Sequence, residues 1–308
     1  MLNKKLTLSI ILFIFSFINY SLSASSSDAT PIRNIVIWHG LGDSCCFPFS
    51  MGKIKDIIQN QYPGVYVKSI EIGSSIDEDV YNSWFKNVNE QIDMACEMIK
   101  ADTNLTNGFN AVGFSQGSLF LRAFVERCND PPVHNLISIG GPQNGVFGAP
   151  RCATTNGTFC NVARNLLELG AYDEYVQNNL VPAEYWQDPL QYSKFLEKSI
   201  FLADINNMKD VKNQTYKDNL LSLNKFALTL FLNDTIVIPR ESEHFGWYEE
   251  GQAKNIIPME KTQLYQEDWI GIQQLDNEGK LIFLESPGNH LQFTEQWFIE
   301  NIIPLLNE

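Results

Sequence analysis

The sequence predicts an α/β fold in which helices flank a mostly parallel central sheet and a largely helical, lid-like insertion interrupts the pattern. Three observations lead to this prediction. Short apolar runs alternate with helical stretches over much of the chain, an order typical of parallel strands joined by crossover helices. The alternation stops between residues 141 and 224. One apolar run also ends in a glycine-flanked serine, Ser115, directly before a helix-like stretch.

The strands of the predicted sheet are short apolar runs. A helical stretch at 82–100 precedes the third run and is a natural crossover helix. The six predicted strands are Ile35–Trp38, Gly64–Ile70, Phe109–Val112, Leu136–Ile139, Phe226–Leu232 and Leu281–Leu284.

The segment 141–224 shows helical patterns at 162–169 and 192–201, proline and asparagine punctuation, and little strand character. We interpret it as an insertion within the main domain. Its aromatic side chains could pack a small subdomain core or line an acyl-chain groove, and a core role is the expectation for most of them. A lid over the carboxyl ends of the strands is nonetheless where a long apolar ligand would be buried. The aromatic residues of the insertion are Tyr172, Tyr175, Tyr185, Trp186, Tyr192 and Phe195.

The N-terminus has the layout of a cleavable secretory signal. Lys4 and Lys5 precede an apolar run over 6–18, and small residues follow at 21–24. The run is shorter than the ~20 apolar residues that a helix needs to cross a bilayer, which disfavours an uncleaved membrane anchor. We expect a signal peptide at 1–23, one domain over 24–308, and no stable membrane span.

An oxidising secretory route favours disulfides over free thiols or zinc sites. Proximity pairs Cys152 with Cys160 and leaves the pairing of the other four cysteines open; those are Cys45, Cys46, Cys96 and Cys128. None resembles a set of metal ligands. Entry into this route also makes four asparagines, each followed two places on by threonine, credible glycan acceptors. They are Asn104, Asn156, Asn213 and Asn233.

The charge of the chain restricts its partners. A net charge of −14 and a pI near 4.7 argue against nucleic acid and against attraction to anionic bilayers. There is no phosphate-cradling glycine loop with its lysine. We therefore expect no nucleotide chemistry, no cofactor and no metal.

The serine lies where a nucleophile would be expected. A strand that turns sharply into a helix holds its apex residue in strained geometry, so the flanking positions must be nearly free of side chains. Gly113 and Gly117 satisfy this requirement around Ser115. The amide of Gln116 would then point at the helix N-terminus, where an oxyanion would form. A glycine-rich turn without chemistry is the alternative.

A base and an acid follow in the order Ser, Asp, His that α/β-hydrolases use. His290 follows a strand-like run and the turn 286–289, whereas His244 lies in a polar stretch with no strand directly before it. His39 and His134 do not suit the base position. Asp234 ends the run 226–232 and would hold the imidazole tautomer. A simple Asn-Asp turn is the alternative for this residue.

A second oxyanion donor is expected in the loop after the first long strand. Gly40 and Gly42 remove steric barriers there, so backbone amides can approach a substrate closely. The amide of Leu41 is the predicted donor. We interpret His39 as a structural residue of this loop rather than a catalytic one.

Long segments of the chain also resemble the palmitoyl-protein thioesterases, lysosomal enzymes of the α/β-hydrolase superfamily. The similarity runs from about 31 to 305 and is far more specific than the serine motif alone. The segments are 38–46 (WHGLGDSCC), 113–117 (GFSQG), 140–147 (GGPQNGVF), 199–204 (SIFLAD) and 286–290 (SPGNH).

The resemblance implies an α/β-hydrolase domain over 24–308 and agrees with the assignments made from position. It implies Ser115 as nucleophile, Asp234 as acid, His290 as base, and the amides of Leu41 and Gln116 as the oxyanion hole. It further implies the disulfides Cys45–Cys46, Cys96–Cys128 and Cys152–Cys160, of which position alone gave only the last. The insertion 141–224 would contribute to a palmitate groove, and N-glycans would engage the lysosomal sorting machinery.

The function expected is removal of palmitoyl and other long-chain acyl groups from thioester-linked cysteines of lipid-modified proteins or peptides during lysosomal degradation. S-palmitoylated proteins and palmitoyl thioesters would be its partners. The expected location is the lysosome, reached through the secretory pathway, with secretion as a further destination. A secreted carboxylesterase or lipase acting on oxygen esters is the nearest alternative, because a triad does not distinguish the two ester types. A non-catalytic hydrolase-fold binding protein is more distant, since no triad member is missing.

Overall fold

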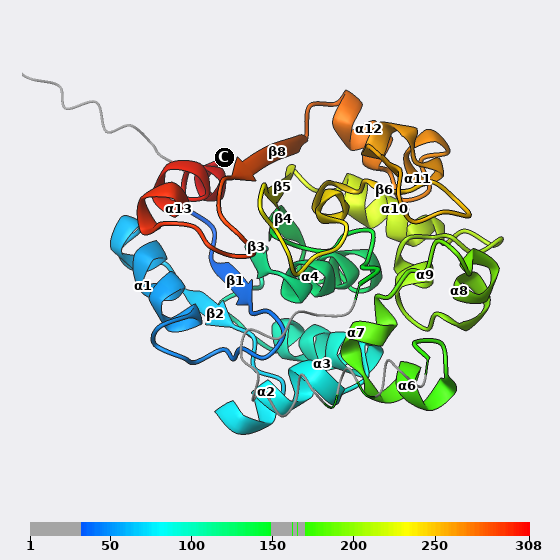
Figure 1. Cartoon of the computed structure of the whole chain (residues 1–308). Helices are drawn as coiled ribbons and strands as arrows, with labels where there is room; N and C mark the ends of the chain where they lie inside the picture. The colour runs from blue at the N-terminus through cyan, green and yellow to red at the C-terminus, as the bar shows by residue number, and fades with distance from the viewer. Residues whose placement is uncertain (1–31, 149–161, 163–164, 166–169) are drawn as a thin grey trace, which may run out of the picture. The chain divides into compact units, whose positions relative to one another are not determined.

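A six-stranded, fully parallel sheet forms the centre of the computed structural model, which describes residues 32–148, 162, 165 and 170–308 (Figure 1). The strand order is β2-β1-β3-β4-β5-β8, and every neighbouring pair is parallel. The predicted α/β class with a parallel central sheet is confirmed. The strands are β1 Ile35–Trp38, β2 Val67–Ser69, β3 Phe109–Phe114, β4 Val133–Ile139, β5 Lys225–Phe231 and β8 Leu281–Ser286.

The central strands are buried on both faces, which explains why they appear in the sequence as continuous apolar runs. In β1, Ile35 and Ile37 pack into the core on one face, whereas Val36 and Trp38 pack into the core on the other. Helices α1 (Met51–Gln61) and α13 (Glu295–Asn301) cover the first face, and α3 (Val88–Lys100) and α4 (Gln116–Arg127) cover the second (Figure 1). The sheet is therefore the middle layer of three.

The strand order reverses between β1 and β3, since β2 lies on the outer side of β1 and later strands follow β3. In open α/β sheets a crevice forms outside the carboxyl ends of the strands at such a switch point. The loop after β1 carries Leu41, and the turn after β3 carries Ser115. The topology alone thus brings these two residues to one place.

Several of the predicted element boundaries need correction. The helix predicted over 82–100 is two helices, α2 (Ile76–Phe85) and α3, because the side chain of Asn87 caps α3 by accepting a hydrogen bond from the amide of Asn89 at 2.9 Å. The second strand is shorter than predicted, because Gly64 has a φ of +88° in the turn that precedes β2.

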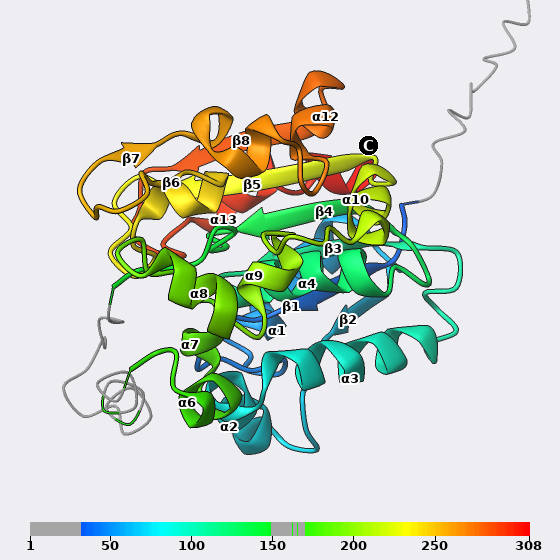
Figure 2. The same ribbon diagram turned by 90° about the vertical axis from the view of Figure 1, so that its right-hand side faces the viewer.

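The connection between β4 and β5 contains five helices among the described residues: α6 (Glu174–Asn179), α7 (Val181–Glu184), α8 (Tyr192–Lys198), α9 (Leu202–Ile205) and α10 (Gln214–Leu221). Helices α6, α7 and α8 gather at the side of the sheet where the strands end (Figure 2). The helix predicted at 192–201 ends at Lys198. Most of the helix predicted at 162–169 lies outside the described residues.

The aromatic residues of the insertion include buried, partly buried and exposed side chains. Tyr172, Tyr185 and Phe195 belong to the main core, as expected for most of the set. Trp186 and Tyr192 pack against that core while partly exposed, and Tyr175 is 63% exposed. A core role therefore holds for most of these side chains.

A second excursion, between β5 and β8, contains only short elements, and the sequence analysis assigned none of them. A two-stranded antiparallel hairpin lies within it. The elements are η1 Arg240–His244, β6 Trp247–Tyr248, β7 Ile256–Ile257, η2 Met259–Lys261, α11 Gln263–Gln266 and α12 Ile272–Asn277, and the chain closes with η3 Pro304–Asn307.

Two disulfides are present in the structure, Cys45–Cys46 and Cys96–Cys128. The signal peptide expected at 1–23, the Cys152–Cys160 pair and Asn156 lie outside the described residues. The other three sequon asparagines, Asn104, Asn213 and Asn233, are exposed. In the parts of the chain that the structure describes, no helix is both long enough and apolar enough to span a bilayer.

Arg122 on α4 is the fully buried cation that joins the insertion to the central layer. Its guanidinium donates to the Glu126 carboxylate at 2.7 Å, to the Gln143 side chain at 2.8 Å and backbone at 3.0 Å, and to the Asn206 side chain at 2.6 Å. It also donates to the carbonyl of Ile205 at 3.2 Å. A buried charge is tolerated only when it is paired and hydrogen-bonded, and this network meets that condition.

We predict that Arg122→Met destabilises the protein by about 3–5 kcal/mol, because the substitution leaves the Glu126 carboxyl buried without its partner. Urea unfolding followed by tryptophan fluorescence measures the change. Lys53→Met is the matched control, since Lys53 and Glu295 form an ion pair in which both side chains are more than half exposed. Its cost should stay below about 1 kcal/mol. Equal costs for the two variants would contradict the role given to Arg122.

Candidate active site

Ser115 lies at a strained turn between β3 and α4. It is not glycine, yet its φ is 53° and its ψ is −126°. Its backbone amide donates to the carbonyl of Ile139 at 2.8 Å, which anchors the turn to β4. A Cβ at Gly113 would lie 2.3 Å from Ser118 Cα, and one at Gly117 would lie 2.4 Å from the carbonyl oxygen of Trp38. Neither flank of Ser115 can therefore carry a side chain.

The structure brings Ser115, His290 and Asp234 into one hydrogen-bonded row. Ser115 Oγ lies 2.8 Å from His290 Nε2, and His290 Nδ1 lies 2.5 Å from Asp234 Oδ2. The residues follow the carboxyl ends of β3, β8 and β5. Since parallel strands end at the same edge of the sheet, loops that are far apart in the sequence meet there. The row can act as nucleophile, base and acid.

Asp234 is held as a carboxylate by hydrogen bonds. Its Oδ1 accepts from the amides of Ile236 at 2.6 Å and Val237 at 2.9 Å. Burial raises the pKa of Asp234, but the hydrogen bond and the charge interaction with His290, together with the hydrogen bond from the Ile236 amide, outweigh burial and bring the pKa below its ordinary value. An ionised Asp234 selects the His290 tautomer with its proton on Nδ1, so Nε2 is free to accept the serine proton.

A second buried carboxyl, Glu243, lies beside this row, and sequence reasoning missed it. Glu243 is on η1, and its Oε2 accepts from the amide of Phe231 at 2.7 Å. Its Oε1 lies 3.9 Å from His290 Nδ1. Burial is the main cause that raises the pKa of Glu243 well above its ordinary value, and Asp234 adds to the effect. In the sequence Glu243 is one of several acids in a polar stretch, and nothing in its spacing distinguishes it.

The loop after β1 packs against the serine turn. A Cβ at Gly40 would lie 3.0 Å from Ser115 Cβ, so glycine permits this close approach. Within the described part of the chain, the amides of Leu41 and Gln116 donate no backbone hydrogen bond. Two free N–H groups beside a nucleophile are what an oxyanion hole requires.

His39 is a structural residue of this loop, as the sequence analysis expected. It is 2% exposed, and its Nδ1 and Nε2 face the Gly40 carbonyl at 2.9 Å and Asp79 Oδ1 at 3.1 Å. Asp79 on α2 also accepts from the amides of Cys45 at 2.9 Å and Ile72 at 2.8 Å. Through these hydrogen bonds the Asp79 carboxylate holds the loop that carries Leu41 in place.

The remaining two histidines make backbone contacts away from Ser115. His134 Nε2 bonds to the carbonyl of Glu308 at 3.1 Å. His244 Nε2 lies 3.0 Å from the carbonyl of Leu228 and 3.2 Å from that of Leu284. His290 is thus the histidine whose ring meets the serine.

A cavity beside Ser115 has a mainly apolar lining. It reaches from Leu41 and Ser115 to side chains of the insertion and of the loop after Asp234. The apolar and aromatic lining residues are Pro142, Val146, Pro182, Tyr185, Trp186, Ile236 and Val237. The cavity has a volume of about 50 Å³, so its apolar surface suits the first carbons of a hydrocarbon chain attached to the carbonyl that Ser115 would attack.

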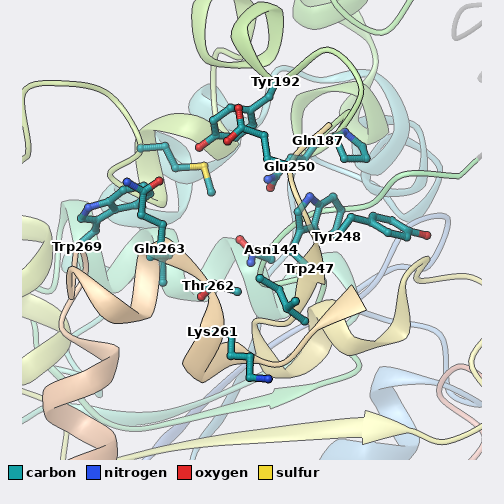
Figure 3. Close-up of a pocket in the computed structure, with 14 residues that line it drawn as sticks. Asn144, Gln187, Tyr192, Trp247, Tyr248, Glu250, Lys261, Thr262, Gln263 and Trp269 are labelled. Carbon is teal, nitrogen blue, oxygen red and sulfur yellow. The ribbon is translucent and has the colours of Figure 1, made fainter. Parts of the chain in front are cut away.

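A separate cavity of about 230 Å³ contains none of the row residues. Trp247 and Trp269 lie on opposite sides of it, and Tyr192 and Gln263 also border the space (Figure 3). Within the part of the chain that the structure describes, the hydrogen-bonded serine and histidine and the two free amides lie instead at the cavity beside Ser115.

Comparisons with known proteins point in one direction. A family model described as palmitoyl protein thioesterase matches residues 34–290. Palmitoyl-protein thioesterase 1 of Caenorhabditis elegans is 47% identical, covering 91% of this chain and 94% of the relative. Palmitoyl-protein thioesterase 3 of Dictyostelium discoideum is 41% identical, covering 84% and 85%. Lysosomal thioesterase PPT2 homolog of Drosophila melanogaster is 29% identical, covering 87% and 88%. The resemblance seen in the sequence is confirmed.

We predict that the His39–Asp79 pair makes the protein most stable in weakly acidic solution. Burial lowers the pKa of His39, but Asp79 and the Gly40 carbonyl more than offset this, so the pKa lies above 6.5. Burial raises the pKa of Asp79, but its hydrogen bonds hold it below 3.8. The His39 contribution is complete below 6.5 and is lost as the pH rises through its folded pKa. The Asp79 contribution is complete above 3.8 and is lost as the pH falls through its folded pKa.

Urea unfolding midpoints between pH 4 and pH 8 test this prediction. The midpoint of the wild type should decline above about pH 6.5, and His39→Gln should weaken that decline. His134→Gln is the control, because burial lowers the pKa of this partly buried histidine and its variant should keep the decline. An identical pH dependence for wild type and His39→Gln would refute the assignment.

Proposed function

The chain belongs to the palmitoyl protein thioesterase family, and we propose that it hydrolyses long-chain fatty acyl thioesters on cysteines of lipid-modified proteins or peptides, with Ser115, His290 and Asp234 as its catalytic triad. That the chain is a thioester hydrolase follows from its family. The observation that carries the finer proposal is the 2.8 Å contact between Ser115 Oγ and His290 Nε2 at the edge of an apolar cavity.

In the first half-reaction, Ser115 Oγ attacks the thioester carbonyl carbon while His290 Nε2 takes the serine proton. The amides of Leu41 and Gln116 hold the oxyanion that develops. The carbon–sulfur bond then breaks, and the cysteine sulfur leaves with the proton returned by His290. A thiol has a pKa near ~8.5, so it needs much less proton assistance on leaving than an alcohol does.

In the second half-reaction, water attacks the ester that joins the acyl group to Ser115. His290 accepts a proton from this water and returns it to the serine oxygen as the carbon–oxygen bond breaks. The products are the free fatty acid and the original enzyme. Asp234 remains ionised throughout and stabilises the imidazolium that forms twice in each cycle.

The lysosome is the proposed site of action. Relatives include proteins named lysosomal thioesterase. The exposure of Asn104, Asn213 and Asn233 is compatible with N-glycans that would direct sorting. An acidic compartment would also match the pH range in which the His39–Asp79 pair contributes most to stability.

We predict that Ser115→Ala lowers kcat/KM for palmitoyl-CoA by at least about 10³-fold and abolishes labelling by a fluorophosphonate probe, since the attacking oxygen is gone. Ser69→Ala is the matched control, because the Ser69 hydroxyl is buried without a hydrogen-bond partner in the described structure and lies on β2. It should retain labelling and activity. Equal labelling of wild type and Ser115→Ala would end the catalytic assignment.

We also predict that wild type cleaves a palmitoyl thioester with higher kcat/KM than a matched oxygen ester. The easier departure of the thiol is the physical reason. Steady-state rates on the two substrates at the same pH measure the preference. A clear preference for the oxygen ester would favour a carboxylesterase or lipase instead.

A further inference from the structure

The Glu243 carboxyl lies behind the Asp234–His290 pair and has one oxygen without a partner. Glu243 is fully buried, and only its Oε2 accepts a hydrogen bond, from Phe231. No group in the described part of the chain donates to its Oε1. One carboxylate oxygen each of Glu243 and Asp234 and a ring nitrogen of His290 lie within 4.8 Å of one another. The unpartnered oxygen is therefore next to the pair that activates Ser115.

Two carboxylates this close in a buried site cannot both be ionised without a large cost, so one of them holds a proton. The neighbours decide which one. Asp234 accepts from two backbone amides and from His290, all of which favour its charged form. Glu243 accepts from a single amide. The proton therefore belongs on Glu243. It is carried by Oε1, because no group donates a hydrogen bond to that oxygen.

The titratable groups that face Glu243 agree with this distribution. Asp234 comes from the loop after β5, His290 from the loop after β8, and Glu241 from the same η1. Both acids disfavour a charge on Glu243, and burial acts in the same direction, so the pKa of Glu243 is raised well above its ordinary value.

We propose that Glu243 is a positioning residue of the triad, a neutral carboxylic acid that donates a hydrogen bond to Asp234 and so fixes the carboxylate that orients His290. This inference rests on the proposed function of Ser115, Asp234 and His290. The donated proton withdraws negative charge from Asp234 and leaves less of it to stabilise the imidazolium. Loss of this donor is therefore expected to change the pH dependence of the reaction as well as its rate.

Substitution of Glu243 separates this role from simple packing. Glu243→Leu removes the donor, so kcat should fall about tenfold or more with little change in KM, and the acid limb of the kcat/KM profile should move to higher pH by roughly half a unit or more. Glu243→Gln can still donate to Asp234 and accept from Phe231. It should recover most of the lost kcat and return the acid limb toward its wild-type position.

Glu184 provides the matched control. It is a fully buried glutamate on α7 whose pKa burial also raises, and it accepts from the amide of Val88 at 2.9 Å. Glu184→Leu should alter stability without moving the acid limb. A Glu243→Leu enzyme with wild-type kcat and an unmoved acid limb would overturn the proposal, as would a Glu243→Gln enzyme as impaired as Glu243→Leu.

An infrared difference spectrum keeps the proposal testable even if Glu243→Leu does not fold. Wild type minus Glu243→Gln at pH 7 should contain the carbonyl band of a protonated carboxylic acid. A carboxylate band in its place would overturn the proposal. Activity that survives Ser115→Ala would instead refute the proposed function, and the infrared result would still report on the Glu243 proton.

Discussion

The strained turn at Ser115 is the constraint around which the rest of the site is arranged. Backbone from β1 and from the first turn of α4 approaches it so closely that Gly113 and Gly117 leave no space for a Cβ, and Gly40 brings the neighbouring loop against the serine itself. A positive φ at a residue with a side chain persists only where the surroundings enforce it. Here the anchor to Ile139 and the packed parallel sheet supply that enforcement, and they hold the hydroxyl at the level of the loops after β5 and β8.

Buried charges connect this turn to the outer parts of the molecule. Asp79 gathers the loop with the free Leu41 amide, and Arg122 ties α4, which begins just after Ser115, to the insertion. Each group is costly to bury alone and is satisfied by several partners from different segments. The partners are loops and short helices with little regular structure of their own, so these polar contacts determine where the loops lie. The positions of the loops at the site are thus fixed by buried polar networks, which are themselves supported by the apolar sheet.

The sequence was informative where local pattern and tertiary environment agree. The central strands could be located because burial on both faces demands unbroken apolar runs, and Ser115, Asp234 and His290 could be selected because each follows an apolar run. The break at Asn87 escaped detection because helical periodicity continues across it, and only the cap marks the new helix. Glu243 could not be predicted from the sequence, because it matters only through its position. The fold places η1 beside the end of β5 and the loop after β8, so Glu243 lies next to Phe231 and His290.

Asn233 directly precedes Asp234, is exposed, and its side-chain amide donates to the carbonyl of Pro287, three residues before His290, at 2.6 Å. An oligosaccharide attached there would stand on the outer surface of the two loops that meet at the triad. The neighbouring Asp234 side chain is fully buried, so the sugar would extend into solvent on the side away from the triad. Sugar at this position would therefore cover the outer side of both loops without reaching the groups that react.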